Sequence, residues 1–345
     1  MSVIIIGAGA AGCEAAFRLA EAGIQVEVVE KENQPGGNLN NWYQLFPDRK
    51  PASLLRQRLQ QCVSHPLVHL HTGTVPVKIQ RTPQGSFNVN LDDGALLEGK
   101  ALLVTTGFRT FDATRKEEYG YGIYENVITS VELENYLANG SLSTSTGKLP
   151  QRIGFIQCVG SRDEKMCNFH CSKVCCITAV KQAIELRELF PDAEILCFYM
   201  DMRMFGPGYE EMYREAQEKY NIKFIRGRLS EASENQEKQV FVKCEDTLIG
   251  KPLRMTLDVM VLMVGMESSD GSRWLAKELG LNLAPNGFIQ ASDPHYATNL
   301  TNVEGIFIAG CVSSPMNLTD TLTDARSAAL AIQEFLTIPI HRLLV

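Results

Sequence analysis

The chain has 345 residues, of which 45% are hydrophobic and 21% are charged, and its formal net charge at pH 7 is -7. This length allows two domains with ordinary globular cores, and the negative charge argues against a nucleic-acid-binding protein. No run of about 18 apolar residues is present, so we expect no membrane span. The amino-terminal apolar stretch is too short for a signal peptide. Ten cysteines without an export signal predict a reducing, cytoplasmic location, where clustered thiols serve as ligands or redox groups.

The first 30 residues predict a strand, a glycine turn, a helix from Cys13 to Ala22 and a second strand. The turn fits the pattern G-x-G-x-x-G, in which glycines permit a tight turn, close approach of a pyrophosphate, and close packing of helix and strand. The pyrophosphate would bind at the amino terminus of the helix. Glu30 ends the second strand, at the spacing of a carboxylate that binds a ribose. The predicted dinucleotide site therefore comprises Gly7, Gly9, Ala10, Ala11, Gly12 and Glu30.

Three further segments favour FAD over NAD as the dinucleotide. Residues 30–39 resemble the E-(x)n-G-G stretch of two-dinucleotide-binding flavoproteins, and Thr105-Thr106-Gly107 resembles their A-T-G turn. Residues 305–311 resemble their late G-I-F-A-A-G-D strand, with Cys311 in place of the aspartate. A helix starting near Leu318-Thr319 would direct its positive end at the flavin. We therefore add Lys31, Gly37, Asn38, Leu39, Val75, Thr105, Thr106, Gly107, Gly310, Cys311, Leu318 and Thr319 to the predicted FAD site.

The rest of the chain predicts a second α/β unit. Residues 66–110 indicate an antiparallel meander of strands, and residues 111–150 are polar and irregular, with a flexible linker near 139–148. A strand over 152–157, a helix to about Phe190, a strand over 194–199 and a helix over 209–220 follow. We predict an α/β fold with two Rossmann-like domains: an FAD-binding domain formed by 1–112 and 288–345, a connecting segment 113–150, and an inserted domain 151–287.

Five cysteines fall between residues 158 and 176, where a second glycine fingerprint would otherwise stand. Cys171, Cys175 and Cys176 have the spacing i, i+4 and i+5, which on one helix would bring three thiols toward one end. Cys158, at the end of the preceding strand, would complete a set of four. Four thiolates match a [4Fe–4S] cluster and also tetrahedral zinc, and a disulfide between Cys175 and Cys176 is a third possibility. Cys167 is the spare thiol.

With these cysteines and the stretch Gln157-Cys158-Val-Gly-Ser-Arg-Asp163, the chain resembles the A-subunit family of heterodisulfide reductases, which has a thioredoxin-reductase-like core. The spacing of Cys158, Cys171, Cys175 and Cys176 is similar to the cluster motif of that family. Residues 112–114, 119–122 and 126–129 are similar to its connecting segment. The resemblance implies an oxidoreductase that binds FAD and a [4Fe–4S] cluster, passes electrons between them, and assembles with other subunits of a heterodisulfide-reductase-like complex. A homodimer is also expected.

The chain departs from the methanogen members of the family in two respects. It has no ferredoxin-like cluster motif, and Ser314-Pro315-Met316-Asn317-Leu318 stands where those members tend to have Gly-Pro-Lys-Asp-Ile. A missing lysine near the flavin argues against electron bifurcation. The short form is similar to the corresponding protein of sulfur oxidisers, which implies cytoplasmic oxidation of sulfane sulfur with a lipoate-binding protein as partner.

Three alternatives remain open at this point. They are a bifurcating component of the methanogen type, a stand-alone NAD(P)H-dependent disulfide reductase, and a zinc-stabilised flavin-binding scaffold without turnover. No residue qualifies from the sequence as a catalytic acid or base.

Overall fold

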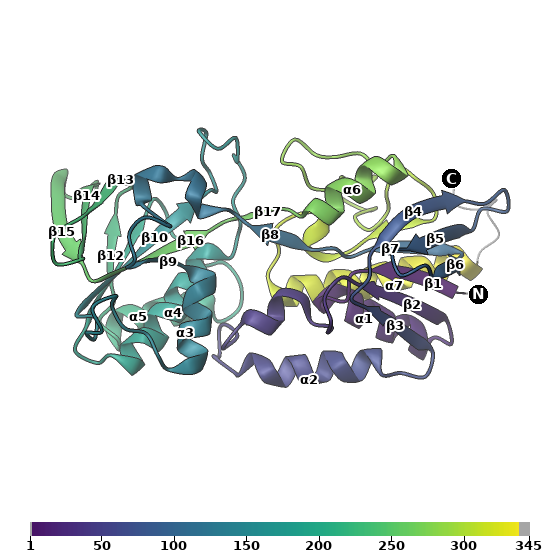
Figure 1. The fold of residues 1–345 in the computed structure, drawn as a ribbon, viewed down its shortest axis with the longest axis horizontal. Helices are drawn as coiled ribbons and strands as arrows, with labels where there is room; N and C mark the ends of the chain where they lie inside the picture. Colours follow the sequence, from purple (N-terminus) through teal and green to yellow (C-terminus); the bar gives the residue numbers. More distant parts are fainter. Residues whose placement is uncertain (1, 338–345) are drawn as a thin grey trace. The chain divides into compact units, whose positions relative to one another are not determined.

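The computed structural model describes residues 2–337, and these residues form two compact units (Figure 1). Unit 1 comprises the segment that ends at Asn40, the segment Ser53–Arg109 and the segment that begins at Glu267. Unit 2 comprises Asn41–Ala52 and Thr110–Met266. No helix within the described residues is long and apolar enough to cross a membrane.

Unit 1 is built on a five-stranded parallel sheet with the strand order β18-β7-β1-β2-β3. These strands are β1 (Ser2–Ile6), β2 (Gln25–Glu30), β3 (Val68–Thr72), β7 (Ala101–Val104) and β18 (Ile306–Ile308). An antiparallel meander of β4 (Pro76–Arg81), β5 (Phe87–Leu91) and β6 (Leu96–Gly99) packs with α6 (Asp270–Leu279) around one apolar core. The remaining helices are α1 (Ala10–Glu21), α2 (Ala52–Val63) and α7 (Leu318–Thr337), with short 3-10 turns at Gly37–Asn41 and Gly310–Val312.

Unit 2 repeats this plan with a second parallel sheet, in the order β12-β11-β10-β16-β9. The strands are β9 (Val127–Thr129), β10 (Arg152–Val159), β11 (Glu194–Tyr199), β12 (Lys223–Arg226) and β16 (Val259–Val264). Helices α3 (Ser130–Asn139), α4 (Cys175–Leu189) and α5 (Tyr209–Glu218) share one core with the sheet. On the other face of the sheet, a second core is shared with the meander of β13 (Leu229–Glu234), β14 (Val240–Asp246) and β15 (Lys251–Leu257).

The two sheets correspond strand by strand. In each sheet the first strand of the unit's central β-α-β motif, β1 or β10, lies in the middle and pairs in parallel with the strand that follows its helix. Each sheet also has a three-stranded antiparallel meander as its companion. The predicted fold class, an α/β protein with two Rossmann-like domains, is therefore confirmed.

The segments that join the units differ from expectation in two places. Residues 111–150 are not irregular throughout, because they contain β9, α3 and two 3-10 turns, Ala113–Arg115 and Glu117–Tyr119. Thr129 and Glu132 form a capping box at the start of α3, a sequence signal that identifies a helix start. The chain returns to unit 1 at Glu267 rather than at 288, because α6 packs against the meander of unit 1 through Leu275 and Ala276. The short strands β8 (Phe108–Thr110) and β17 (Met266–Ser268) pair where the chain passes between units.

Candidate functional site

The glycine fingerprint forms the turn between β1 and α1. Gly7 has a φ of +108°, and a Cβ atom there would stand 2.6 Å from the carbonyl oxygen of Thr105. A Cβ atom on Gly12 would stand 1.9 Å from the carbonyl oxygen of Gly7. At Gly9, by contrast, no atom of the described residues lies within 4 Å of such a Cβ. Two glycines are therefore required by the protein's own packing, and the third leaves open space where a ligand can approach the backbone.

Helix α1 begins at Ala10, three residues earlier than predicted, with Gly9 as its N-cap residue. Gly9 has no side chain to cap the helix, and the first turn carries no acidic residue. The amides of Ala10, Ala11 and Gly12 belong to that first turn, whose N–H groups have no carbonyl partner within the helix. This end of α1 is a site for an anion such as a pyrophosphate.

Glu30, at the end of β2, is buried beside the fingerprint. One carboxylate oxygen accepts a hydrogen bond from the amide of Ala8 at 2.7 Å, and the other accepts one from the amide of Glu32 at 2.9 Å. These bonds fix the carboxylate where it can also bind a ribose hydroxyl. Lys31, in contrast, has an exposed side chain that pairs with Glu32 at 3.3 Å.

The Gly-Gly stretch packs directly on the fingerprint. The amide of Gly36 donates to the carbonyl oxygen of Ala8 at 2.7 Å, and a Cβ atom on Gly37 would be 3.1 Å from the Cα of Gly9. Leu39 is buried, and the side-chain amide of Asn38 donates to the carbonyl oxygen of Phe108 at 3.4 Å. The structure therefore brings this stretch and the fingerprint together.

The T-T-G turn after β7 lies behind the fingerprint. The hydroxyl of Thr105 donates to the carbonyl oxygen of Gly7 at 2.7 Å, whereas that of Thr106 lies 2.7 Å from the hydroxyl of Ser272 in α6. Gly107 has a φ of +63° and open space on its Cβ side. Among the other predicted residues, Leu318 is half-buried at the start of α7, and Val75 and Thr319 are exposed.

A carboxylate in α7 binds the backbone at the end of the late strand, where Cys311 stands in place of the aspartate. Gly310 has a φ of +74°, and its amide donates to the carboxylate of Asp324 at 2.7 Å. Burial raises the pKa of Asp324 above its usual value, while the Gly310 amide and Asn299 oppose that rise. The Cys311 thiol donates to the carbonyl oxygen of Met316 at 3.5 Å. Asp324 is not among the residues predicted from the sequence, and no local pattern distinguishes it from Asp320 and Glu334 in the same helix.

These residues fit a bound FAD. The open side of Gly9 and the helix end provide a place for the pyrophosphate, and Glu30 provides a ribose acceptor. The bound cofactor would supply exchange between two-electron and one-electron transfer.

In unit 2 the corresponding junction, between β10 and α4, carries the cysteines. Helix α4 begins at Cys175, so the prediction that Cys171 shares a helix with Cys175 and Cys176 is wrong. Lys173 has a φ of +60°, which the interior of a right-handed helix does not allow, and the amide of Val174 turns back to the carbonyl oxygen of Ser172 at 2.7 Å. Cys171 therefore lies in the loop that precedes α4.

The four predicted ligands are nevertheless close enough for their charges to act on one another. Burial, followed by the charge of the Cys176 thiolate, raises the pKa of Cys158 to about 11. Burial, followed by Cys158, Cys176 and Cys171, raises the pKa of Cys175 well above its usual value. Cys167 is exposed and takes no part in this group. Within residues 2–337, no three Cys, His, Asp or Glu side chains are placed so that they could hold a single metal ion.

The loop that carries these thiols is strained. Four of the seven non-glycine residues with positive φ in the described chain lie here: Cys158, Arg162, Cys167 and Lys173, with φ between +52° and +60°. Such residues persist only where surrounding contacts enforce them, and they gather at functional sites. No local sequence pattern indicated this strain.

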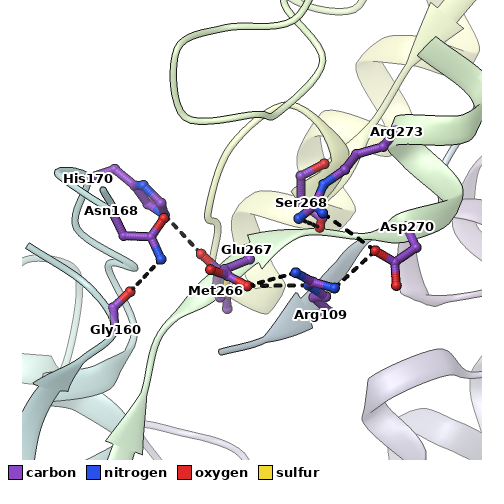
Figure 2. Close-up of polar contacts among 9 residues, drawn as sticks. All are labelled: Arg109, Gly160, Asn168, His170, Met266, Glu267, Ser268, Asp270 and Arg273. Carbon is purple, nitrogen blue, oxygen red and sulfur yellow. Dashed lines mark hydrogen bonds and ion pairs between the residues drawn. The ribbon is translucent and has the colours of Figure 1, made fainter. Parts of the chain in front are cut away.

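Buried polar contacts hold the loop in place. The Asp163 carboxylate binds Lys116 at 2.8 Å and Arg228 at 3.0 Å. Arg162 forms a two-pronged ion pair with Asp201. The imidazole Nε2 of His170 lies 2.9 Å from the carbonyl oxygen of Met266, and the side-chain amide of Asn168 donates to the carbonyl oxygen of Gly160 at 3.0 Å. Both contacts are drawn in Figure 2. The Nε2 atom of His170 thus faces a carbonyl oxygen.

Four buried or half-buried, adjacent thiols fit a group that needs thiolate ligands. A cation bound to these thiolates would offset the cost of burying them, which is the main cause of the raised pKa values of Cys158, Cys175 and Cys176. Where unit 1 has glycines that would contact a pyrophosphate, the corresponding junction of unit 2 has cysteines.

Comparisons with known proteins agree with this description of both units. Residues 5–53 match the family described as NAD(P)-binding Rossmann-like domain, and residues 177–329 match that described as pyridine nucleotide-disulphide oxidoreductase. The chain is 34% identical to the iron-sulfur A-subunit of the CoB–CoM heterodisulfide reductase of Methanocaldococcus jannaschii, over 96% of this chain and 64% of that protein. It is 41% identical to the A-subunit of the H(2):CoB-CoM heterodisulfide,ferredoxin reductase of Methanothermobacter marburgensis, over 68% of this chain and 36% of that protein. The chain thus spans less than two thirds of these relatives.

Solved structures show the same fold. The thioredoxin reductase of T. acidophilum has a TM-score of 0.66 at 21% identity, with 96% of each chain covered. That of Lactococcus lactis has a TM-score of 0.68 at 18% identity, with 97% of this chain and 98% of that chain covered.

Proposed function

Since the chain belongs to the A-subunit family of heterodisulfide reductases and is a flavoprotein oxidoreductase, we propose that it passes electrons between FAD in unit 1 and a [4Fe–4S] cluster in unit 2. The observation that carries this proposal is the gathering of four cysteines at one strand–helix junction, with Cys158 near the end of β10, Cys171 in the loop, and Cys175 and Cys176 at the start of α4. Unit 1 has its glycine fingerprint at the corresponding junction. The M. jannaschii relative is named as an iron-sulfur protein, which supports the same assignment.

The residues divide between the two cofactors. The fingerprint Gly7–Gly12, Glu30, the Gly-Gly stretch and the Thr105–Gly107 turn would hold FAD. The thiolates of Cys158, Cys171, Cys175 and Cys176 would hold the cluster, with Cys167 left out. No residue is proposed as an acid or base.

The substrate chemistry would reside on the partners within a heterodisulfide-reductase-like complex. We propose oxidation of sulfane sulfur in the cytoplasm as the process served, with a lipoate-binding protein as a partner and a homodimer as the assembly. The support is the resemblance to the short proteins of sulfur oxidisers and the ten free thiols, which fit a reducing compartment. Met316 in place of a lysine supports a relay without bifurcation.

The test against a stand-alone reductase is direct. The purified protein, anaerobic and loaded with FAD, is mixed with NADH or NADPH while the flavin absorbance is followed. The proposal predicts no rapid bleaching by either nucleotide, and bleaching by dithionite. Rapid bleaching by NAD(P)H would contradict the electron-relay proposal and favour a stand-alone NAD(P)H-dependent disulfide reductase.

The same protein tests the bifurcation alternative. In a redox titration, the relay predicts that the flavin takes up its two electrons in two resolved one-electron steps. A single two-electron step with strongly crossed potentials would favour the bifurcating type instead.

A further inference from the structure

Gln157, the residue before Cys158, has a buried side chain whose polar atoms form no hydrogen bonds with the described residues. It is 8% exposed, and neither its Nε2 nor its Oε1 atom has a hydrogen-bond partner among the described residues. A buried amide left without partners costs about 1–3 kcal/mol. Gln182, another buried glutamine of unit 2, instead donates to the carbonyl oxygen of Ser130 at 2.8 Å and to Glu134 at 2.7 Å.

The direction of the Gln157 side chain follows from its place in β10. Side chains alternate along a strand, so Ile153 and Phe155 leave the sheet on one face and Ile156 on the other, and Gln157, the next residue, continues on the face of Ile153 and Phe155. The pairing of β10 with β16 shifts register after Ile156 and resumes at Val159. Ile153 and Phe155 belong to the apolar core that also contains Cys175 and Cys176, whereas Ile156 belongs to the core on the meander side. The positive φ of +59° that breaks the extended backbone falls one residue later, at Cys158.

The end of the neighbouring strand brings a sulfur to the same edge of the sheet. The Cys175 thiol lies 3.8 Å from the carbonyl oxygen of Val264, the last residue of β16. Val264 is the register partner of Val159, at the end of β10. The Gln157 amide and the Cys175 sulfur are thus at the same end of two paired strands and on the same side of the sheet.

We propose that Gln157 is a positioning residue whose side-chain N–H donates a hydrogen bond to a sulfur of the cluster held by Cys158, Cys171, Cys175 and Cys176. The inference rests on the proposed function. Thiolate and sulfide sulfurs only accept hydrogen bonds, so an amide N–H is the group that such a site can use. Because a reduced cluster carries one more negative charge, the N–H stabilises the reduced form more than the oxidised form and raises the reduction potential.

The experiment is a redox titration followed by EPR on the anaerobic full chain. Three variants are compared with the wild type: Gln157→Leu, which removes the donor; Gln157→Glu, which keeps the shape but replaces the NH2 group with an acceptor oxygen; and Gln182→Leu as the matched control. We expect Gln157→Leu to reduce the ratio of reduced to oxidised cluster at a fixed potential about tenfold, which is 59 mV for a one-electron couple. Gln157→Glu should lower it further, and Gln182→Leu should leave it unchanged.

A second readout keeps the inference testable if one variant folds poorly. Pulsed EPR in D2O should detect an exchangeable deuteron coupled to the reduced cluster in the wild type and in Gln182→Leu, and lose it in Gln157→Leu or Gln157→Glu. If the wild type holds iron and sulfide, but both Gln157 variants keep the wild-type reduction potential and deuteron coupling, the inference fails and the proposed function stands. If the wild type holds no cluster, both fail.

Discussion

The two strand–helix junctions of this chain occupy the same place in two sheets of the same strand order, but one consists mainly of glycines and the other carries cysteines. In unit 1 the residues 7–9 join β1 to α1 in a tight turn, in which glycines leave backbone N–H groups open to an anion. In unit 2 the residues 160–174 join β10 to α4 in a long, strained loop edged by thiols. The fold thus supplies a ligand position at the carboxyl ends of its strands, and the residues at the junction decide which ligand chemistry it takes.

The surroundings of the two junctions differ for the same reason. The glycine turn is enforced by its own backbone contacts with Thr105 and the Gly-Gly stretch, and it needs few side chains. The cysteine loop needs support from elsewhere in the fold, because Arg162, Cys167 and Lys173 have positive φ values that side chains disfavour. Buried ion pairs such as Lys116–Asp163 hold it instead.

The largest effect on FAD binding is expected when a glycine of the β1–α1 junction is replaced by a residue with a side chain. Gly12→Val should abolish FAD binding and reduce the yield of folded protein, because even a Cβ atom would stand 1.9 Å from a carbonyl oxygen. Gly9→Ala is the matched control for packing, since no described atom lies within 4 Å of its Cβ. It should fold but bind FAD about tenfold more weakly, as measured by flavin fluorescence titration. Full FAD affinity in Gly9→Ala would show that the pyrophosphate does not lie over this residue.

The cysteine junction is tested by removing its thiols one at a time. Cys158→Ser and Cys175→Ser should each lose the iron and acid-labile sulfide while retaining FAD, because the proposed flavin ligands all belong to unit 1. Cys167→Ser should keep both cofactors, since Cys167 is exposed and apart from the group. Iron content that depends on Cys167, or is indifferent to Cys175, would reject the proposed ligand set.

The buried charges of unit 2 provide a third test, on stability. Lys181 is 2% exposed and contacts Glu134 at 2.6 Å, with the carbonyl oxygen of Gln44 at 3.0 Å. Lys181→Met leaves the buried Glu134 carboxylate without its cationic partner, so the free energy of unfolding of unit 2 should fall by about 3–5 kcal/mol. Lys219→Met, which breaks the exposed pair with Glu215, is the control and should have no measurable effect. Chemical denaturation followed by far-UV circular dichroism measures both, and equal effects would show that burial does not matter here.

Glu185 belongs to the same cluster of buried charges as Lys181 and Glu134, and it should make the stability of unit 2 depend on pH. Burial, opposed by Lys181 and reinforced by Glu134, raises the pKa of Glu185 to about 8 in the folded protein. The folded state therefore holds a proton that the unfolded state releases near its ordinary pKa of 4.5, and the associated stability is lost as pH rises toward 8. This group alone contributes a loss of about 1.4 kcal/mol per pH unit across that range. Glu185→Gln should flatten the profile, and an unchanged slope between about pH 5 and 8 would contradict the assignment.

The smallest expected effect is at the helix caps. Thr129→Ala removes the capping box of α3 and should lower the stability of unit 2 by about 1 kcal/mol, with FAD binding unchanged. Ser269 caps α6 in unit 1 by accepting from the amide of Ser272 at 3.1 Å, so Ser269→Ala is the counterpart. It should act on unit 1 by a similar amount. Thermal unfolding monitored by flavin release and by far-UV circular dichroism separates the two, and coupled losses would mean that the units do not unfold separately.

The fold and the glycine junction could be predicted well from the sequence because both depend on local signals. Apolar strands, the fingerprint and the terminal helix are recognised from short patterns, and β11 and the start of α5 fall where expected. The cysteine loop was less predictable, because no local sequence pattern signals the positive φ values of Lys173 and Cys158. Asp324 was missed because its partners Gly310 and Asn299 lie 14 and 25 residues away along the chain. That the buried polar atoms of Gln157 lack partners is visible only in the folded chain.

The measurement that tests the central claim most directly is iron and acid-labile sulfide analysis of the anaerobically purified wild type, combined with EPR during a redox titration. We predict about four iron and four sulfide per chain and a reducible [4Fe–4S] signal alongside bound FAD. Zinc bound in place of iron, with no sulfide, would contradict this assignment and leave a flavin-binding scaffold in its place.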